Sequence, residues 1–262
     1  LLVISNWRTF AVISFHKLFM SKSDLTISLN EVLFSFTRAA FGVEAPIVLS
    51  EDFARANMWI SENGFDPSLC SLKALDNLDS QASSLSIKFE KTKAVGHLFC
   101  PEEKLLSSLE ASSSSVDWIE INSRVSELKI SNVDAPFLVV SAIGANQCSG
   151  LTVSWVDQDK SQYQVNFIDN ETWEIISSSV NPIELTTGAD MLITSFNAND
   201  NIPQGSNIKK FNVTKAKLKT LNNGVQVREN WQGIYDYFSR CLVESSAESR
   251  ASGAGAGMVD TD

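Results

Sequence analysis

The chain has 262 residues, of which 44% are hydrophobic and 20% are charged, and its formal net charge is −10. This composition excludes disorder as the main state. The acidic balance argues against broad nucleic-acid binding, because that needs Lys and Arg to neutralise phosphates. We therefore expect an acidic, soluble, cytoplasmic protein that has no nucleic-acid partner and does not insert into membranes.

Residues 1–19 differ from the rest of the chain. They contain no methionine, and the first methionine is Met20. Their longest apolar run, Phe10–Phe15, is shorter than the core of a signal peptide, and polar residues interrupt the segment too often for a membrane span. We expect residues 1–19 to be non-native or translated from upstream, with the native protein starting near Met20.

Residues 20–80 are expected to form a helical cap of about three helices. Ser28 and Glu31 have the spacing of a capping box, and an apolar stripe at helical spacing follows and ends near Gly42. The second helix is expected to start just after Ser50, with Glu51 and Asp52 in its first turn, and the third to cover Pro67–Leu78. A cap of this size is not expected to fold alone.

Residues 81–228 are expected to be rich in β-structure. Alternation of polar and apolar residues predicts strands at 116–121, 163–168 and 208–213, among others. The serine-rich stretch 111–115 is interpreted as a loop or linker. Residues 137–142 are continuously apolar, which fits either a strand buried on both faces or the start of a buried helix. The short strands predict a mostly antiparallel sheet or a sandwich.

Residues 229–262 are expected to form a C-terminal helix over 231–243 and a Gly/Ala-rich tail. The order of helices, strands and helix predicts an α+β fold in one integrated domain. In the tail, alternating glycines permit backbone amides to surround an anion, and Arg250 can clamp a carboxylate or phosphate. The candidate ligand-binding residues are Ser249, Arg250, Gly253, Gly255, Gly257 and Asp260. A flexible tail is the alternative.

Both ends of the chain carry a family resemblance. The segment Ser28–Val32, the run Arg38-Ala39-Ala40 and the pair Glu51-Asp52 lie at one end, and Ser249-Arg250 with Gly253–Gly257 lies at the other. These residues resemble an uncharacterised proteobacterial family, Domain of Unknown Function 3726. The resemblance implies a bacterial protein that starts near Met20, and it supplies no reaction.

A second group of candidates is polar and lies before residue 100: Asn30, Glu31, Arg38, Glu51, Asp52 and His97. The carboxylates are a possible acid/base set if burial shifts their pKa values. Helix capping and complementing the helix dipole explain the same carboxylates, and we prefer that interpretation. His97 is more typical of a structural histidine than of a lone base.

Basic residues gather near the C-terminal helix. Lys215, Lys217 and Lys219 alternate, which predicts three lysines on one face of a strand. Protection of a sheet edge against pairing with another chain explains them better than an anion-binding face. The four cysteines show no zinc-binding spacing, so we expect no metal site and no cofactor.

The sequence leaves three functions open. The leading hypothesis is an accessory, assembly or small-anion-binding protein in which the C-terminal tail forms part of a site or interface. The first alternative is an enzyme that acts on a small anionic metabolite with carboxylate acid/base chemistry, and the second is a purely structural protein. The partner is expected to be a small anionic metabolite or another protein, and a homodimer is plausible.

Overall fold

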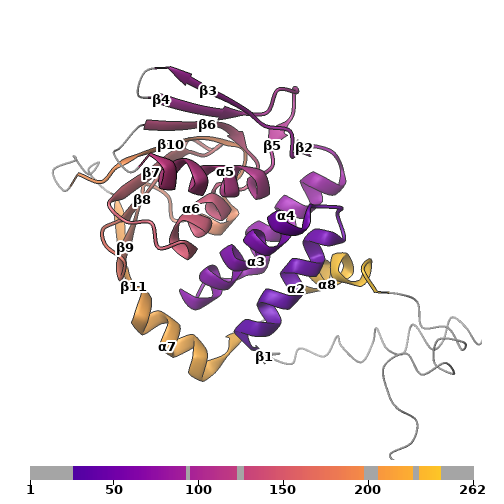
Figure 1. The fold of residues 1–262 in the computed structure, drawn as a ribbon. Coiled ribbons are helices and arrows are strands. Elements are labelled where there is room, and N and C mark those ends of the chain that lie inside the picture. The colour runs from indigo at the N-terminus through magenta and orange to yellow at the C-terminus, as the bar shows by residue number, and fades with distance from the viewer. Residues whose placement is uncertain (1–25, 93–94, 123–126, 198–205, 227–229, 243–262) are drawn as a thin grey trace, which may run out of the picture.

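The computed structural model describes residues 26–92, 95–122, 127–197, 206–226 and 230–242. In these ranges a large mixed sheet lies against several layers of helices, which confirms the α+β prediction (Figure 1). None of the helices in these ranges combines the length and the apolar character that crossing a membrane requires.

The helices of the described ranges are α2 (Leu29–Phe41), α3 (Ile47–Glu62), α4 (Pro67–Asp79), α5 (Ser108–Ile121), α6 (Pro136–Ala145), α7 (Val213–Asn223) and α8 (Trp231–Ser239), with a short 3₁₀ turn at Ile183–Leu185. The strands are β1 (Thr26–Ile27), β2 (Ser83–Ser84), β3 (Lys88–Thr92), β4 (Val95–Phe99), β5 (Leu105–Leu106), β6 (Glu127–Val133), β7 (Leu151–Val156), β8 (Gln162–Phe167), β9 (Thr172–Ser177), β10 (Ala189–Ser195), β11 (Asn207–Asn212) and β12 (Val225–Gln226).

Ten of the strands form one sheet whose main path has the order β11-β9-β8-β7-β10-β6-β4-β3. Neighbouring strands from β11 to β6 are antiparallel, and β6 runs parallel to β4 and β5. The choice between a sheet and a sandwich is therefore resolved for the described ranges as a mostly antiparallel sheet. Strands β1 and β12 form a separate two-stranded pair.

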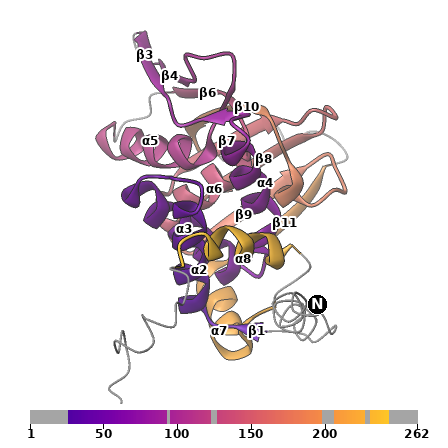
Figure 2. The ribbon, with the colours of Figure 1, turned by 90° about the vertical axis from the view of Figure 1, so that its right-hand side faces the viewer.

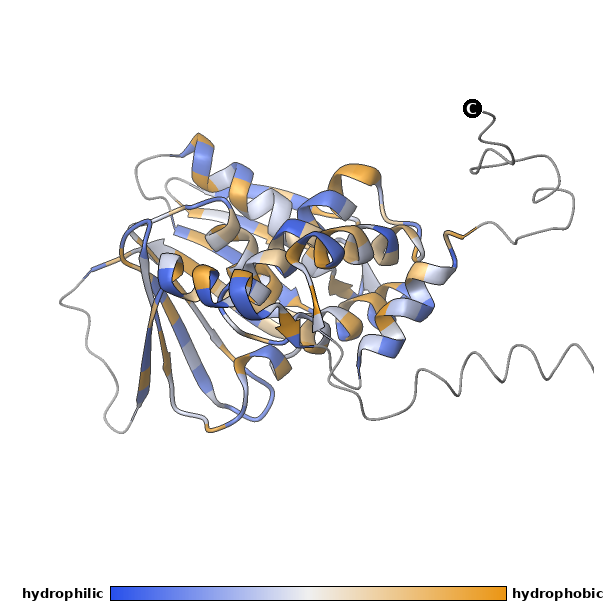
Figure 3. Ribbon diagram, turned by 90° about the horizontal axis from the view of Figure 1, so that it is seen from below, coloured by the Kyte–Doolittle hydropathy of each residue, from blue (hydrophilic) through white to orange (hydrophobic). Residues whose placement is uncertain are grey.

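The strand register gives the sheet one hydrophobic face and one polar face. Residues paired directly across strands lie on the same face. Met191, Trp155 and Tyr163 form one such row and are buried. The next row, on the opposite face, contains Ser154 and Gln164. Hydrophobic and hydrophilic bands alternate along the strands accordingly (Figure 3).

The helices cover the hydrophobic face, which we call the inner face. Helix α5 reaches this face through Trp118, whose ring would touch a Cβ placed on Gly96. Trp59 of α3 packs on Trp173 of β9, with ring centroids 4.8 Å apart. Helix α6 packs against α3 and α5, and α2 and α8 pack beyond α3 (Figures 1 and 2). The helical cap thus shares its core with the sheet.

The structure corrects two predictions between residues 111 and 121. The predicted linker at 111–115 and the predicted strand at 116–121 are one helix, α5. Buried Ser115 donates to the carbonyl of Ala111 at 2.5 Å, so its hydroxyl is satisfied inside the helix. Helix α5 packs against α6, and this tertiary contact outweighs the local alternation. Residues 137–142, left open as strand or helix, belong to α6.

The structure also corrects the predictions for the lysines at 215–219 and for the carboxylates at 51 and 52. Lys215, Lys217 and Lys219 lie on helix α7 rather than on a strand. Lys217 pairs with Glu62 at the end of α3, with Nζ and Oε1 2.7 Å apart. Helix α3 begins at Ile47, so Glu51 and Asp52 lie beyond its first turn and do not serve the helix dipole as expected.

The start of α2 follows the prediction. Ser28 Oγ accepts from the amide of Glu31 at 3.2 Å, and Glu31 Oε2 accepts from the amide of Ser28 at 2.7 Å. These hydrogen bonds lower the pKa of Glu31. The helix ends at Phe41, with Gly42 as its C-terminal cap.

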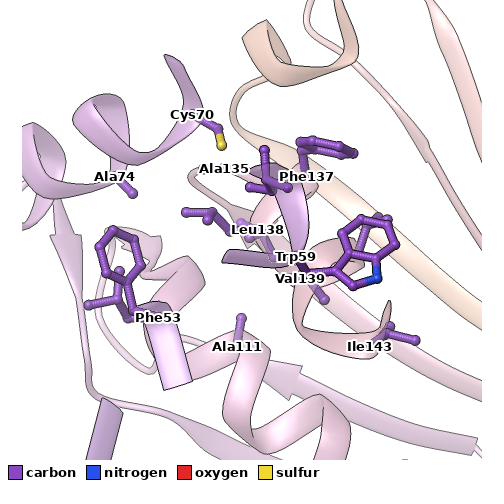
Figure 4. Close-up of a cluster of buried hydrophobic side chains, with 14 of the residues drawn as sticks. Phe53, Trp59, Cys70, Ala74, Ala111, Ala135, Phe137, Leu138, Val139 and Ile143 are labelled. Carbon is purple, nitrogen blue, oxygen red and sulfur yellow. The ribbon is translucent and has the colours of Figure 1, made fainter. Parts of the chain in front are cut away.

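The core contains a tight crossing between α3 and α6. Figure 4 shows Trp59 beside Val139 and Ile143 in the buried cluster. A Cβ on Gly144 would lie 2.4–2.8 Å from three atoms of the Trp59 ring. Glycine at 144 is therefore required by close packing.

We expect Gly144→Ala to lower the free energy of unfolding by about 1–3 kcal/mol, the usual cost of overpacking, because the buried ring of Trp59 cannot move aside. Urea denaturation measures this loss. Adding Trp59→Phe should recover part of it in the double variant. A Gly144→Ala protein as stable as the parent would contradict the proposed contact.

Candidate functional site

A cleft of about 630 Å³ lies where four segments distant in sequence meet. The end of α3, the start of α4, helix α7 and strand β12 line it. We call it the junction cleft, and its polar lining consists of Ser61, Asn63, Asp66, Lys219, Thr220, Asn223 and Gln226. Its volume lies within the usual range of small-molecule sites.

Local sequence explains the turn that forms one wall. Gly64 has φ of 81°, a conformation that glycine adopts without strain, and a Cβ there would meet no atom within 4 Å. Asp66 then caps α4, and Pro67 occupies the first helical position, where its missing N–H is not needed. The turn therefore directs Asn63 and Asp66 to the cleft.

Asp66 is the buried carboxylate of the cleft. Its Oδ1 accepts from the amide of Ser68 at 2.9 Å and from the Ser68 hydroxyl at 2.6 Å. Nearby, Cys70 is fully buried, and burial together with the carboxylates of Glu184 and Asp66 raises the pKa of its thiol to about 12. Cys70 therefore stays protonated at neutral pH and is not a nucleophile.

Hydrogen bonds fix the opposite wall. Thr220 of α7 donates to the carbonyl of Ser61 at 3.1 Å, which holds α7 against the end of α3. On the other side of the turn, Trp173 Nε1 donates to Asn63 Oδ1 at 2.9 Å and ties the cleft to the sheet. Lys219 is exposed and makes no ion pair with a described residue. It is thus available to an anion that enters the cleft.

A second, larger cavity of about 910 Å³ lies on the outer face of the sheet, opposite the helices. We call it the outer groove. It is lined by side chains of β7, β8 and β10, including Ser154, Gln164 and Leu192. Two carboxylates, Asp157 and Asp190, line it, and its described lining contains no Lys, Arg or His. This charge disfavours an anion in the outer groove.

The structure does not bring the predicted site residues together. Ser249, Arg250, Gly253, Gly255, Gly257 and Asp260 lie outside the described residues. Asn30 is exposed in the first turn of α2. The Arg38 guanidinium lies over the ring of Phe34, 4.8 Å from its centroid. On α3, Glu51 is exposed and Asp52 pairs with Arg55.

His97 lies inside β4, on the outer face. Its Nε2 is 2.8 Å from the hydroxyl of Ser131, and its ring lies 4.9 Å from that of Phe99. It lines a cavity of about 310 Å³ that meets the outer groove at Asn132. Ser131 thus gives the His97 ring a hydrogen-bond partner within the sheet.

The junction cleft was missed by the sequence interpretation. Asn63-Gly64 and Pro67 were recognised as helix boundaries, but nothing local connects them with Lys219, more than 150 residues away. The alternation of lysines also indicated a strand, and on a strand Lys219 would belong to a sheet edge and not to a helix beside the α3–α4 turn. Arg250, the predicted clamp on a ligand anion, lies outside the described residues. Within them, the buried carboxyl with a strongly raised pKa is Asp134, which lines neither cavity.

No protein-family model matches the chain, and no curated protein matches it. Solved structures do resemble it. Malate dehydrogenase from Pyrococcus horikoshii OT3 is 7% identical with a TM-score of 0.57, and the match covers 86% of this chain and 98% of that one. Sulfolactate dehydrogenase from Methanocaldococcus jannaschii is 11% identical with a TM-score of 0.51, covering 82% and 96%.

A third similar structure is delta1-piperideine-2-carboxylate reductase from Pseudomonas syringae pvar. tomato. It is 8% identical with a TM-score of 0.52, and the match covers 81% of this chain and 99% of that one. At these identities the similarity concerns architecture alone. The chain shares the fold of these dehydrogenases and reductases.

Proposed function

We propose that the protein is an enzyme that acts on a small carboxylate bound in the junction cleft. The observation that carries the proposal is the fold shared with enzymes named for malate, sulfolactate and piperideine-2-carboxylate, all of them small carboxylates. The lining of the cleft also supports this proposal. It contains Lys219, which has no ion-pair partner among the described residues, together with the polar residues of the α3–α4 turn.

The proposed roles follow from charge and burial. Lys219 pairs with the substrate carboxylate, and the side-chain amide of Asn223 donates to one of its oxygens. Asp66 exchanges a proton with the substrate, because it is the buried carboxylate of the cleft lining. The proposal follows the enzyme alternative of the sequence interpretation, and it gives Lys219 the role that the sequence suggested for Arg250.

Dehydrogenation also needs a hydride acceptor, for which a nicotinamide dinucleotide is the usual class. A dinucleotide diphosphate commonly binds at the N-terminus of a helix. At the cleft that terminus belongs to α4, where Pro67 has no N–H and the Asp66 carboxylate occupies the amide of Ser68. The described lining does not fit such a cofactor, so we assign only carboxylate binding and proton transfer.

A binding protein without turnover is the second candidate. The observation that favours it is the capping role of Asp66, whose Oδ1 is already engaged by Ser68. In this case the cleft still binds a small carboxylate through Lys219, and Asp66 only holds α4 in place.

Calorimetry with pyruvate, oxaloacetate and malate tests binding, with glycerol as the neutral control. We expect Lys219→Met to weaken carboxylate binding about tenfold or more, because a charge-assisted contact contributes roughly 1.5–3 kcal/mol. Lys215→Met is the matched control, since Lys215 is exposed on the same helix and does not line the cleft. Equal affinities for all three proteins would overturn the proposal.

Deuterium exchange tests catalysis without any cofactor. In D₂O an active carboxylate base speeds exchange at the carbon next to the carbonyl of pyruvate, which proton NMR follows. Asp66→Asn should abolish the protein's contribution and keep binding, because asparagine also caps helices. Binding without exchange in the parent protein would support the binding protein instead.

A further inference from the structure

We propose that the free edge of β3 is an interface at which the protein pairs with a second copy of itself. The two β3 strands run antiparallel, in a register that sets Lys88 of each copy opposite Glu90 of the other. The sheet then continues through both copies. This inference does not rest on the proposed function, because the described lining of the junction cleft contains no residue of β3.

Strand β3 lies at one edge of the sheet. It pairs with β4, and the described residues place no strand along its other side (Figures 1 and 2). All five of its residues are exposed. An edge strand presents unpaired N–H and C=O groups to another strand unless a proline or a bulge blocks it. Strand β3 contains no proline and pairs with β4 along its whole length without a register shift, so its edge is open to pairing.

The pairing with β4 assigns the side chains of β3 to the two faces of the sheet. Phe89 lies opposite Leu98, which is buried, so Phe89 is on the inner face. Glu90 lies opposite His97 on the outer face, and Lys88 shares this face because side chains alternate along a strand. The edge therefore carries an aromatic ring on one face and a basic and an acidic side chain on the other.

Two-fold symmetry restricts the registers in which two β3 strands can pair. The axis of such an antiparallel pair is perpendicular to the sheet, so each residue keeps its face and the pairing is centred on a residue. Centring on Lys88 or Lys91 sets two lysines opposite each other, and centring on Glu90 sets two glutamates opposite each other. Centring on Phe89 sets Lys88 opposite Glu90 twice. Opposite charges meet at this centre and not at the other three, so charge selects the register.

The same register brings the two Phe89 rings together on the inner face. Phe89 is 47% exposed, and its ring centroid lies 5.0 Å from that of Trp118 on α5. Asn122 accepts from Nζ of Lys91 at 3.4 Å, which places the end of α5 beside the edge. There Ile121 is 80% exposed. A single copy leaves these apolar side chains in water, and pairing of the strands removes the Phe89 rings from water, which favours the dimer.

The length of β3 limits the strength of the dimer. Five residues on each copy are fewer than the roughly 20–30 residues on each side of a standard interface. We therefore expect a dissociation constant on the order of 10–100 µM. Sedimentation equilibrium on the full chain, at concentrations from about 1 µM to about 1 mM, measures it.

Two charge reversals test the register. Lys88→Glu or Glu90→Lys sets like charges opposite each other at both contacts, so each variant should dimerise at least about tenfold more weakly than the parent protein. An equimolar mixture of the two variants should recover the affinity of the parent, because one then carries only acidic and the other only basic side chains at these positions. Lys129→Glu is the matched control, since Lys129 is exposed on the outer face of β6, inside the sheet.

The variant that carries both reversals exchanges the two charges and should dimerise like the parent, which gives a second result if a single variant does not fold. Added salt should weaken the parent dimer and strengthen the dimer of each single variant. A parent protein that stays monomeric at about 1 mM, or single variants that dimerise as tightly as the parent, would overturn the proposal. Lys219→Met leaves dimerisation unchanged, so failure here is distinguishable from failure at the junction cleft.

Discussion

Replacing Asp134 by asparagine should make the protein more stable at pH 8, by up to about 3 kcal/mol. The Asp134 side chain is fully buried at the junction of β6 and α6. Burial raises the pKa of its carboxyl from 3.8 to about 6, although the amide of Ser108, 2.8 Å from Oδ1, opposes that shift. A difference of about two pKa units corresponds to roughly 3 kcal/mol.

The sign follows from the two pKa values. Because the folded-state pKa of Asp134 lies above its unfolded value, the folded protein holds the proton more tightly. The stability from this group is complete below about pH 4, and it is lost as pH rises through about 6. Asparagine has no charge to bury and still accepts from the amide of Ser108. The variant therefore does not lose this stability as pH rises.

Urea denaturation of parent and variant from pH 4 to pH 8 measures the effect as a difference between two curves. Exposed carboxylates such as Asp79, whose pKa is lowered by hydrogen bonds from Arg240, affect both proteins equally and cancel. Asp169→Asn is an exposed control that should follow the parent at every pH. Parallel curves for parent and Asp134→Asn would show that Asp134 does not titrate in this range.

Replacing Trp173 by alanine should lower the free energy of unfolding by about 3–5 kcal/mol, the usual cost of deleting a buried indole. Trp173 is 1% exposed and stacks on Phe211, with ring centroids 4.3 Å apart, and contacts Trp59 at 4.8 Å. Its indole also donates to Asn63 Oδ1. The residue therefore joins the sheet both to the core helices and to the wall of the junction cleft.

Trp173→Phe separates packing from hydrogen bonding. The variant keeps a ring but leaves Asn63 Oδ1 without its donor, which costs about 1–3 kcal/mol. We also expect weaker carboxylate binding, because Asn63 holds the turn that forms one wall of the cleft. Trp231→Phe is the control: Trp231 is a partly buried indole that packs against the core and does not line the cleft. If Trp173→Phe binds carboxylates as tightly as the parent protein, the hydrogen bond between Trp173 and Asn63 does not contribute to binding in the cleft.

The two cavities give the protein two different chemical environments on opposite sides of one sheet. The junction cleft joins helices to β12 and contains Lys219. The outer groove is acidic and rich in carboxamides.

The sequence by itself determined the elements whose signals are local. The capping box of Ser28 and Glu31, the stop at Gly42 and the start of α4 at Pro67 depend on hydrogen bonds or dihedral angles within a few residues, and the structure agrees with each. The alternation at 163–168 and 208–213 correctly predicted β8 and β11, because strands with one buried face repeat every two residues.

Only the tertiary structure decided the rest. Residues 111–121 form a helix that packs on α6, and no local pattern encodes this contact. Lys217 and Thr220 place α7 through bonds to the end of α3, more than 150 residues away, and so create the junction cleft. A cleft between distant segments depends on long-range packing, which is why local spacing predicted the turn at Asn63 and Gly64 but not the lysine that faces it.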